Sequence, residues 1–539
     1  MSESINKGNE SGVSAPGGEF EIPVEELDQS CRTPVLFMFY KAGGWLVLSA
    51  LFGLLNSVRF HAPDLLAHCP WLTYGRVEAF ASVAFVYGFA LQAAFGVALW
   101  LVVRMSRTAL VKPGFIFVGA CFWNIGVAVG AVGILAGDGA PHVLFELPRY
   151  AVPILLVAYA LMAGLGLVAF LKRQSKELYV SQWFLFAAFL WFPWILTAAT
   201  LLLQYFPVRG VAQVAIAGWY GTGLTMIVLG GIGLAILFYL IPKLSERPLH
   251  SRHMALFAFW LLLFFGNSAG ILSGSTLPSW ISGLSAAMSF FVCLAAALVG
   301  LNLYHTVGNR LSSLFEPEFR FVTVATVSFL LLGLLGAVNA MSGVAELTQF
   351  TLVLPALQTL ALGGFIMMAL FAGIYHILPR ILGINESQIG AVNLHFWLSL
   401  GGLALTIGVL GLGGLLQGQT MIDPTIPFTA VTKSALTFLR LETVGSILLL
   451  AGSVVFMVNV GKVACRLVCC GPKGILSGLT GAENVEEGSE TAASESRPRT
   501  NAVAPKRAAN KAPKKSAKKT TKKAAAPKRK QAKKAAKKS

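Results

Sequence analysis

The chain has 539 residues, of which 55% are hydrophobic and only 12% are Asp, Glu, Lys or Arg. A soluble globular domain carries about 25% charged residues, so this composition excludes an ordinary soluble protein and predicts a polytopic membrane protein. The formal net charge of +18 is confined to one end of the chain. Residues 497–539 hold 18 Lys and Arg and no Asp or Glu, and the remainder is neutral.

The first 34 residues are polar, and residues 1–29 contain no apolar run of the kind that a signal peptide needs. Apolar runs long enough to cross about 30 Å of hydrocarbon then follow one another along the chain. They predict about twelve membrane helices, near 35–57, 79–103, 114–136, 150–171, 179–204, 212–242, 254–273, 281–304, 320–340, 349–378, 393–417 and 437–460. The predicted fold class is therefore an all-α membrane protein.

Short loops on one side of this predicted bundle hold most of the loop Lys and Arg, for example Arg104, Arg107 and Lys112. Positive loops face the cytoplasm, so with an even number of helices both termini are predicted to be cytoplasmic. The predicted organisation is a polar segment over 1–34, a membrane domain over 35–460, a juxtamembrane linker over 461–495 and a basic tail over 496–539.

The tail consists of Lys, Ala and Pro in short repeats, as in KAPKKSAKKTTKKAAAPKRK. Such a composition cannot bury a core, and we expect it to be disordered. Its expected partners are anionic membrane lipid or, as the alternative, nucleic acid, in both cases through salt-sensitive contacts with phosphate. A tail that only improves solubility is the third reading.

Several motifs occur in an order and spacing that resemble the catalytic subunit I of the cbb-type (C-family) heme-copper oxidases. The central one is Trp219-Tyr220-Gly221, which is followed at the end of the same predicted helix by Ile241-Pro242-Lys243. The others are YVSQWF from Tyr179, LPSW from Leu277, YHILPR from Tyr375 and NLHFW from Asn393. This resemblance spans about 72–460. It implies a twelve-helix subunit I bundle, heme b and copper as cofactors, and cytochrome c oxidase activity.

That family holds its two hemes and its copper with six histidines, and here those positions carry other residues. The helix-two ligand position falls at Ala81, and the position after Trp-Tyr-Gly is Thr222. The helix-ten pair falls at Ala356 and Gln358, and no histidine lies between His253 and His305, where two copper ligands are expected. Because imidazole is the usual ligand for these metals, we expect no cofactor, no metal site and no catalytic residue.

Other residues are candidates for remnants or substitutes. Arg76 and Arg440 resemble the family arginines near the heme propionates, with interfacial anchoring as the alternative reading. A methionine can bind heme iron, and Met226, Met367 and Met368 lie on the relevant helices, although a methionine in an apolar helix is usually a packing residue. His376 and His395 match family positions near helix ends that are not ligand positions, and a structural role is expected for both.

Three functions remain open from the sequence. The first is a degenerate subunit I without its own heme-copper centre, a pseudoenzyme associated with a respiratory electron-transfer complex in the bacterial inner membrane. The second is an active terminal oxidase with unorthodox ligands. The third is a transporter or ligand-binding protein on the same bundle, for which we expect polar cavity residues among Thr222, Asn267, Ser268 and Gln358. We also expect the space of the hemes to be filled, either by bulky side chains such as Phe264, Phe265, Phe290, Phe291 and Phe365 or by lipid or a small ligand.

Overall fold

The structure is a computed structural model that describes residues 23–174, 177–271, 276–308, 316–383 and 391–470, with side chains up to Lys462. The described helices all lie in one compact unit, Met1–Ala482. A second unit, Glu483–Ser539, lies outside the described residues, and so do the predicted basic tail and most of the predicted linker. Within the described ranges the chain is helical, with one isolated β-bridge between His142 and Phe145.

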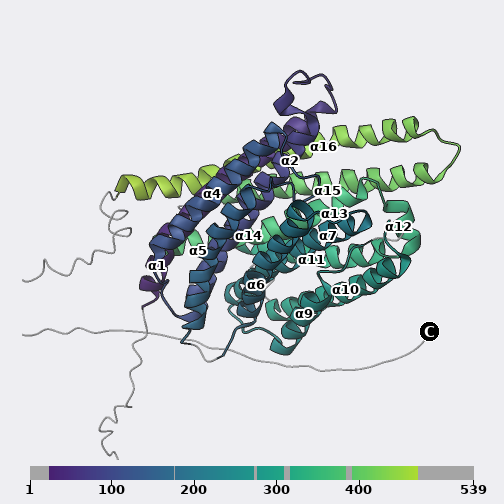
Figure 1. Cartoon of the computed structure of the whole chain (residues 1–539). Helices are drawn as coiled ribbons and strands as arrows, with labels where there is room; N and C mark the ends of the chain where they lie inside the picture. Colours follow the sequence, from purple (N-terminus) through teal and green to yellow (C-terminus); the bar gives the residue numbers. More distant parts are fainter. Residues whose placement is uncertain (1–22, 175–176, 272–275, 309–315, 384–390, 471–539) are drawn as a thin grey trace, which may run out of the picture. The chain divides into compact units, whose positions relative to one another are not determined.

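The first half of the bundle runs from α1 to α8 (Figure 1). Its elements are α1 (Val24–Arg59), η1 (Pro70–Leu72), α2 (Tyr74–Val83), η2 (Ala84–Ala90), α3 (Leu91–Ser106), α4 (Pro113–Ala136), α5 (Ala151–Leu171), α6 (Val180–Thr200), η3 (Leu201–Tyr205), α7 (Val211–Thr222), η4 (Gly223–Leu229) and α8 (Gly230–Leu244). Helix α1 begins inside the segment predicted to be polar, because Leu27 and Cys31 are buried in the bundle.

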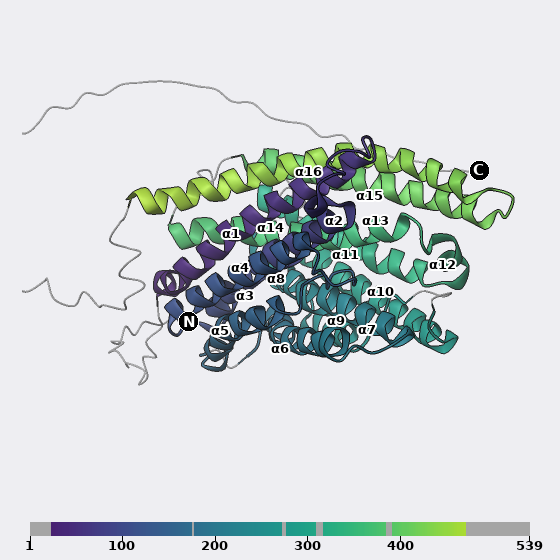
Figure 2. The same cartoon turned by 45° about the horizontal axis from the view of Figure 1, so that its top comes forward.

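The second half runs from α9 to α16. Its elements are α9 (Arg252–Phe265), α10 (Ser279–Val307), α11 (Pro317–Asn339), α12 (Ser342–Thr348), α13 (Val353–Thr359), η6 (Leu360–Met367), α14 (Met368–Leu382), α15 (Val392–Ile422) and α16 (Phe428–Cys470). Helices α15 and α16 pack side by side along one face, and α1 packs against α16 (Figure 2).

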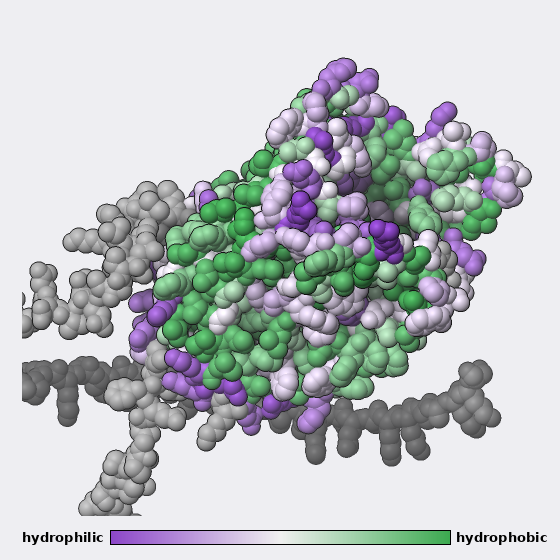
Figure 3. Space-filling view, in the orientation of Figure 1, coloured by the Kyte–Doolittle hydropathy of each residue, from purple (hydrophilic) through white to green (hydrophobic). Residues whose placement is uncertain are grey.

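The predicted membrane bundle is confirmed. Eleven helices of the described residues are long and apolar enough to cross a membrane. The twelfth predicted segment, 254–273, corresponds to the shorter apolar helix α9. The surface in Figure 3 is apolar over the middle of the bundle, with polar residues gathered toward its ends. Exposed apolar side chains such as Phe115, Val132 and Leu171 suit contact with lipid.

Three spans form the centre of the bundle: Tyr74–Ser106, Val211–Leu244 and Val353–Leu382. Their most apolar 18-residue windows are 100%, 89% and 100% buried, whereas no other span exceeds 50%. Each of the three contains a π-helical segment, η2, η4 or η6 respectively. These segments begin one to three residues after Ala81, Thr222 and Gln358. The irregular backbone therefore lies next to the predicted ligand positions. Since π-helical turns are rare and often occur at functional sites, this supports a search for the site in these three spans.

Glycines on α15 let its neighbours approach closely. A Cβ at Gly414 would clash with the backbone nitrogen of Val353, at the start of α13. A Cβ at Gly402 would lie 3.0 Å from the carbonyl oxygen of Gly445 on α16. In lipid, helices associate through close van der Waals packing, so these contacts fix α13 and α16 against α15. They thereby set the walls of the site described next.

Candidate functional site

A cavity of about 320 Å³ lies among α1, α2 with η2, α13 with η6, α15 and α16. Its lining is divided between polar and apolar side chains. The polar residues are Ser49, Glu78, Ser82, Gln358, Thr359, Ser399, Ser446 and Ser453. The larger apolar residues are Leu46, Leu54, Phe85, Val86, Leu362, Met367, Phe371, Leu403 and Leu449. This volume lies at the lower end of the range for small-molecule sites, about 300–1,000 Å³.

Of the predicted ligand positions on the second and tenth spans, one lines this cavity and another is bonded to a residue that lines it. Gln358 lines it from α13. Ala81 lies behind the opposite wall, where its carbonyl oxygen accepts a hydrogen bond of 2.8 Å from Ser49 Oγ. Of the polar residues expected to line such a space, Gln358 does so, whereas Thr222, Asn267 and Ser268 do not. Thr222 instead donates to the carbonyl oxygen of Gly218, one turn earlier, at 2.8 Å.

Glu78 is the acidic side chain of the cavity wall. Its Oε2 accepts a hydrogen bond of 2.8 Å from Asn56 Nδ2 on α1. The described part of the chain contains no salt bridge to Glu78. A second carboxylate, Glu442, lies just behind the wall and accepts hydrogen bonds from Ser446 at 2.6 Å and from Ser57 at 2.8 Å. The Arg59 guanidinium also lies near this side of the cavity, where it donates to Asn56 Oδ1 at 3.5 Å.

A further buried carboxylate, Glu146, connects to the same wall from the loop between α4 and α5. Its Oε1 accepts hydrogen bonds from Ser82 Oγ at 3.0 Å and from the backbone nitrogen of Leu144 at 3.1 Å. Leu144 has a left-handed backbone, with φ at 65°, and its carbonyl oxygen accepts from the Tyr87 hydroxyl at 3.0 Å. Burial raises the pKa of Glu146 to about 7, although both hydrogen bonds act to lower it.

The region on the other side of η6 is densely packed. Phe365 is 1% exposed, and its ring lies 4.8 Å from that of Phe329. A Cβ at Gly233 on α8 would lie 3.1 Å from Phe365 Cζ, so the ring fills the space between η6 and α8. Ala356 is also buried, and a hollow beside Met226 holds only about 10 Å³.

The expectation that five phenylalanines fill this space is correct for Phe365 and wrong for most of the others. Phe264, Phe290 and Phe291 are 67%, 49% and 42% exposed on the surface of the bundle. Phe265 is half-buried and stacks on Phe291 with their ring centroids 4.4 Å apart. These rings face outward because the lipid is as favourable for an aromatic side chain as the protein interior.

The two arginines predicted as remnants of a propionate site both bind backbone carbonyls. Arg76 Nη1 donates to the carbonyl oxygens of Pro70 at 2.6 Å and Leu135 at 3.0 Å. Arg440 Nε donates to the carbonyl oxygen of Phe60 at 2.8 Å. Neither residue lines the cavity. These contacts tie the loop after α1 to its neighbours, and both the propionate role and interfacial anchoring stay predictions.

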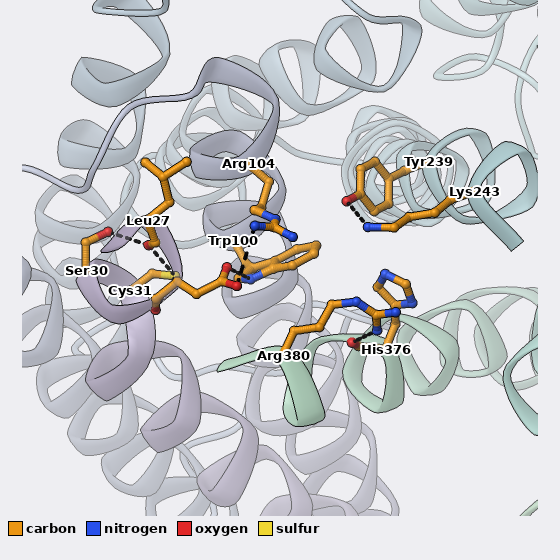
Figure 4. Close-up of polar contacts among 10 residues, drawn as sticks. Leu27, Ser30, Cys31, Trp100, Arg104, Tyr239, Lys243, His376 and Arg380 are labelled. Atoms are coloured by element: carbon orange, nitrogen blue, oxygen red, sulfur yellow. Dashed lines mark hydrogen bonds and ion pairs between the residues drawn. The ribbon is translucent and has the colours of Figure 1, made fainter. Parts of the chain in front are cut away.

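A cluster of ionisable residues lies away from the cavity, and the sequence did not reveal its pairings (Figure 4). Asp28 on α1 is buried and accepts a hydrogen bond of 2.9 Å from Trp100 Nε1, with Arg104 at 3.5 Å. His376 lies 2.9 Å from a Glu318 carboxylate oxygen, and the indole of Trp100 meets the His376 ring edge to face at 6.0 Å. These contacts fix α1 to α3 and α14 to α11.

His395 has a comparable structural setting. It is fully buried, and its Nδ1 lies 3.0 Å from the Tyr375 hydroxyl, which also accepts a hydrogen bond from Asn459 Nδ2 at 3.1 Å. The rings of Phe371 and Phe456 pack against it. The expected structural role of His376 and His395 therefore agrees with the contacts that the structure gives them.

The residues around the cavity do not fit a bound heme. The described residues that line it include no histidine, and Met367 is their one sulfur donor. A heme also carries two carboxylates, which the Glu78 carboxylate would repel. On the packed side, a metal would have to displace the Phe365 ring. Among the described residues, no group of three or more His, Cys, Asp or Glu could hold a metal ion.

Comparisons with known proteins point to one family. Residues 33–448 match the family model described as cytochrome c and quinol oxidase polypeptide I. The cbb3-type cytochrome c oxidase subunit CcoN1 of Stutzerimonas stutzeri is 27% identical over 69% of this chain and 81% of its own length. A cytochrome c oxidase subunit 1 homolog of Azorhizobium caulinodans is 26% identical over 82% of this chain and 84% of its own.

A solved structure has the same fold. A chain of a heme-copper terminal oxidase dimer aligns with a TM-score of 0.65 over 80% of this chain and 84% of its own length, at 16% sequence identity. The helical arrangement is therefore shared, while at this identity the likeness concerns the fold and not the contents of the site.

Proposed function

Because the chain belongs to the cytochrome c and quinol oxidase polypeptide I family, we propose that it is a subunit I-like protein without a heme-copper centre of its own. It is a multi-pass protein of the bacterial inner membrane. The observation that carries the proposal is a cavity that Gln358 lines, with Ala81 bonded to its lining residue Ser49 and the Glu78 carboxylate in its wall. A site of that chemistry lacks imidazole donors and disfavours the carboxylates of heme.

In this function the chain is a non-catalytic partner of a respiratory electron-transfer complex. Support comes from its relatives, which are named as oxidase subunits. This part of the proposal rests on the analogy of a shared fold and on the names of the relatives. The basic tail over 496–539 lies outside the described residues, and its binding to anionic lipid or nucleic acid stays a prediction.

The cavity favours a second function, that of a ligand-binding protein on the same bundle. A hollow with a divided polar and apolar lining is the usual form of a small-molecule site. An oxidase with unorthodox ligands receives less support, because Met367 is the one sulfur donor among the described cavity residues and the packed side of η6 holds the Phe365 ring.

Affinity purification of the full-length chain from mild detergent tests the proposal. We expect subunits of a respiratory complex to co-purify, and we expect the chain separated from them to consume no oxygen when supplied with reduced cytochrome c or quinol. Oxygen consumption by the separated chain at the rate of a family oxidase would overturn the proposal. A matched preparation of a histidine-bearing relative provides the positive control.

A further inference from the structure

We propose that the cavity binds an apolar molecule whose polar end is a protonated amine. This proposal goes beyond the missing heme-copper centre but rests on it, because a heme between α2 and α13 would occupy the same space. It follows from the hydrogen-bonding capacity that the cavity wall has left unused, from its one carboxylate, and from the apolar remainder of the lining.

The first step concerns the hydroxyl hydrogens. Each serine or threonine hydroxyl has one hydrogen to donate and two lone pairs to accept with. Ser49 donates to Ala81, Ser453 to Leu449 and Thr359 to Pro355, all to backbone carbonyl oxygens at 2.7–2.9 Å. Ser82 and Ser446 donate to the carboxylates of Glu146 and Glu442. These five hydroxyls therefore present only acceptors to a molecule in the cavity, and the donors of the lining are the Gln358 amide and the Ser399 hydroxyl.

The second step concerns Glu78. A carboxylate can accept about four hydrogen bonds, and the structure gives Glu78 one, from Asn56. Its remaining capacity faces the cavity that it lines. Glu78 lies in the second turn of α2 and its side chain is exposed, and no salt bridge among the described residues offsets its charge. An ammonium group, with three donors and a positive charge, complements both the carboxylate and the neighbouring lone pairs.

The third step concerns the body of the ligand. Away from Glu78 the cavity is lined by aliphatic and aromatic side chains, among them Leu46, Leu362, Leu403 and Phe371. These side chains favour an alkyl or aryl group and offer nothing to a strongly hydrated one. A neutral alcohol of the same length would keep the apolar contacts and lose the charge-assisted hydrogen bond, and a fatty acid would be repelled by Glu78.

The test uses full-length protein in nanodiscs of neutral phosphatidylcholine, with empty nanodiscs as the background. Radiolabelled decylamine is the probe, and unlabelled decanol and decanoate are the competitors. We expect saturable binding of about one decylamine per chain. Decanol should compete with an affinity at least about tenfold lower than that of decylamine, and decanoate should not compete. No saturable binding, or equal competition by all three, would overturn the proposal.

Two variants act on different features of the cavity. Glu78→Gln keeps the shape and removes the charge, and should weaken decylamine binding about ten- to a hundredfold. Gly53 lines the cavity, and a Cβ added there would meet no atom within 4 Å, so Gly53→Leu should fill the space and abolish binding. The matched controls are Glu346→Gln, an exposed carboxylate on α12, and Gly44→Leu, an equally open position on α1 that does not line the cavity. Both controls should bind as the original chain does.

The heme content of the same samples separates this inference from the proposed function. If heme is absent and decylamine does not bind, the ligand class is wrong and the proposed function stands. If heme is present at about one per chain, both fail. If binding is unchanged in Glu78→Gln and in Gly53→Leu, decylamine binds elsewhere and the cavity proposal is wrong.

Discussion

The two sides of η6 differ in a way that the family fold alone does not explain. On one side, toward α1, α2, α15 and α16, the bundle keeps a cavity of about 320 Å³ with a carboxylate in its wall. On the other side, toward α8, Phe365 fills the space completely and lies against Gly233. Both sides border the same π-helical segment, so one backbone supports a hollow and a packed core.

The segment η6, next to the predicted ligand position Gln358, therefore borders two different kinds of packing. Where a large apolar side chain is available, the interior closes to the density expected of a protein core. Where the lining is polar, closure would bury the Glu78 carboxylate with a single hydrogen bond, from Asn56, and burying a charge in this way is costly. A polar wall therefore preserves a cavity that apolar walls would lose.

The largest change in the free energy of unfolding is expected on the side of η6 that Phe365 fills. Phe365→Ala should lower the free energy of unfolding by about 3–5 kcal/mol, because a buried ring is replaced by a void. Phe85→Ala is the matched control, since Phe85 already borders the cavity and is only half-buried, and it should cost less than half as much. Unfolding by SDS in mixed micelles measures both. Equal losses would contradict the contrast between the two sides.

The next largest effect is a pH dependence of the free energy of unfolding, which we expect from Glu146. The pKa of Glu146 is raised from 4.5 to about 7, so the folded state retains a proton that the unfolded state has released between these values. The contribution of Glu146 to the free energy of unfolding should therefore fall by about 3 kcal/mol as the pH rises from 4.5 to 7, and it should stay constant above pH 7. Glu146→Gln should remove this slope. An unfolding curve of Glu146→Gln with the same pH slope as the original chain would show that another group is responsible.

A smaller effect is expected from overpacking. Gly233→Leu should destabilise the bundle by about 1–3 kcal/mol, because its Cβ already lies 3.1 Å from the Phe365 ring. Combining it with Phe365→Ala should recover part of both losses, since the leucine can enter the space of the ring. Strict additivity of the two losses would mean that the two side chains do not share this space.

The smallest change in the free energy of unfolding is expected for a substitution in the cavity wall. Gly53→Leu should leave the free energy of unfolding unchanged or raise it by about 0.5 kcal/mol, because the cavity accepts the side chain and leucine favours a helix more than glycine does. Gly44→Leu should behave in the same way. A loss of 2 kcal/mol or more (about the cost of overpacking) in Gly53→Leu alone would argue that the cavity is closed in solution.

Much of the fold could be predicted from the sequence, because the length of an apolar run decides whether a helix spans the membrane. The start of α1 could not, since Leu27 and Cys31 pack into the bundle from a stretch with Glu25, Glu26 and Asp28. The predicted ligand positions do lie on the three most buried spans, and Gln358 lines the cavity.

Other features of the site required the structure. Glu318 and His376 are 58 residues apart, and nothing in a helical pattern pairs them. The outward direction of Phe264 and Phe290 could not be predicted either, because a phenylalanine facing lipid and one facing the core have the same apolar neighbours in sequence.

The most direct test of the central claim is a reduced-minus-oxidised absorption spectrum of the full-length protein purified from heme-replete cells. The absence of imidazole at Ala81, Thr222, Ala356 and Gln358 predicts no heme band at any significant fraction of the protein concentration. A b-type heme band at a stoichiometry near one per chain would contradict that claim, because it would show that this bundle holds heme through other residues.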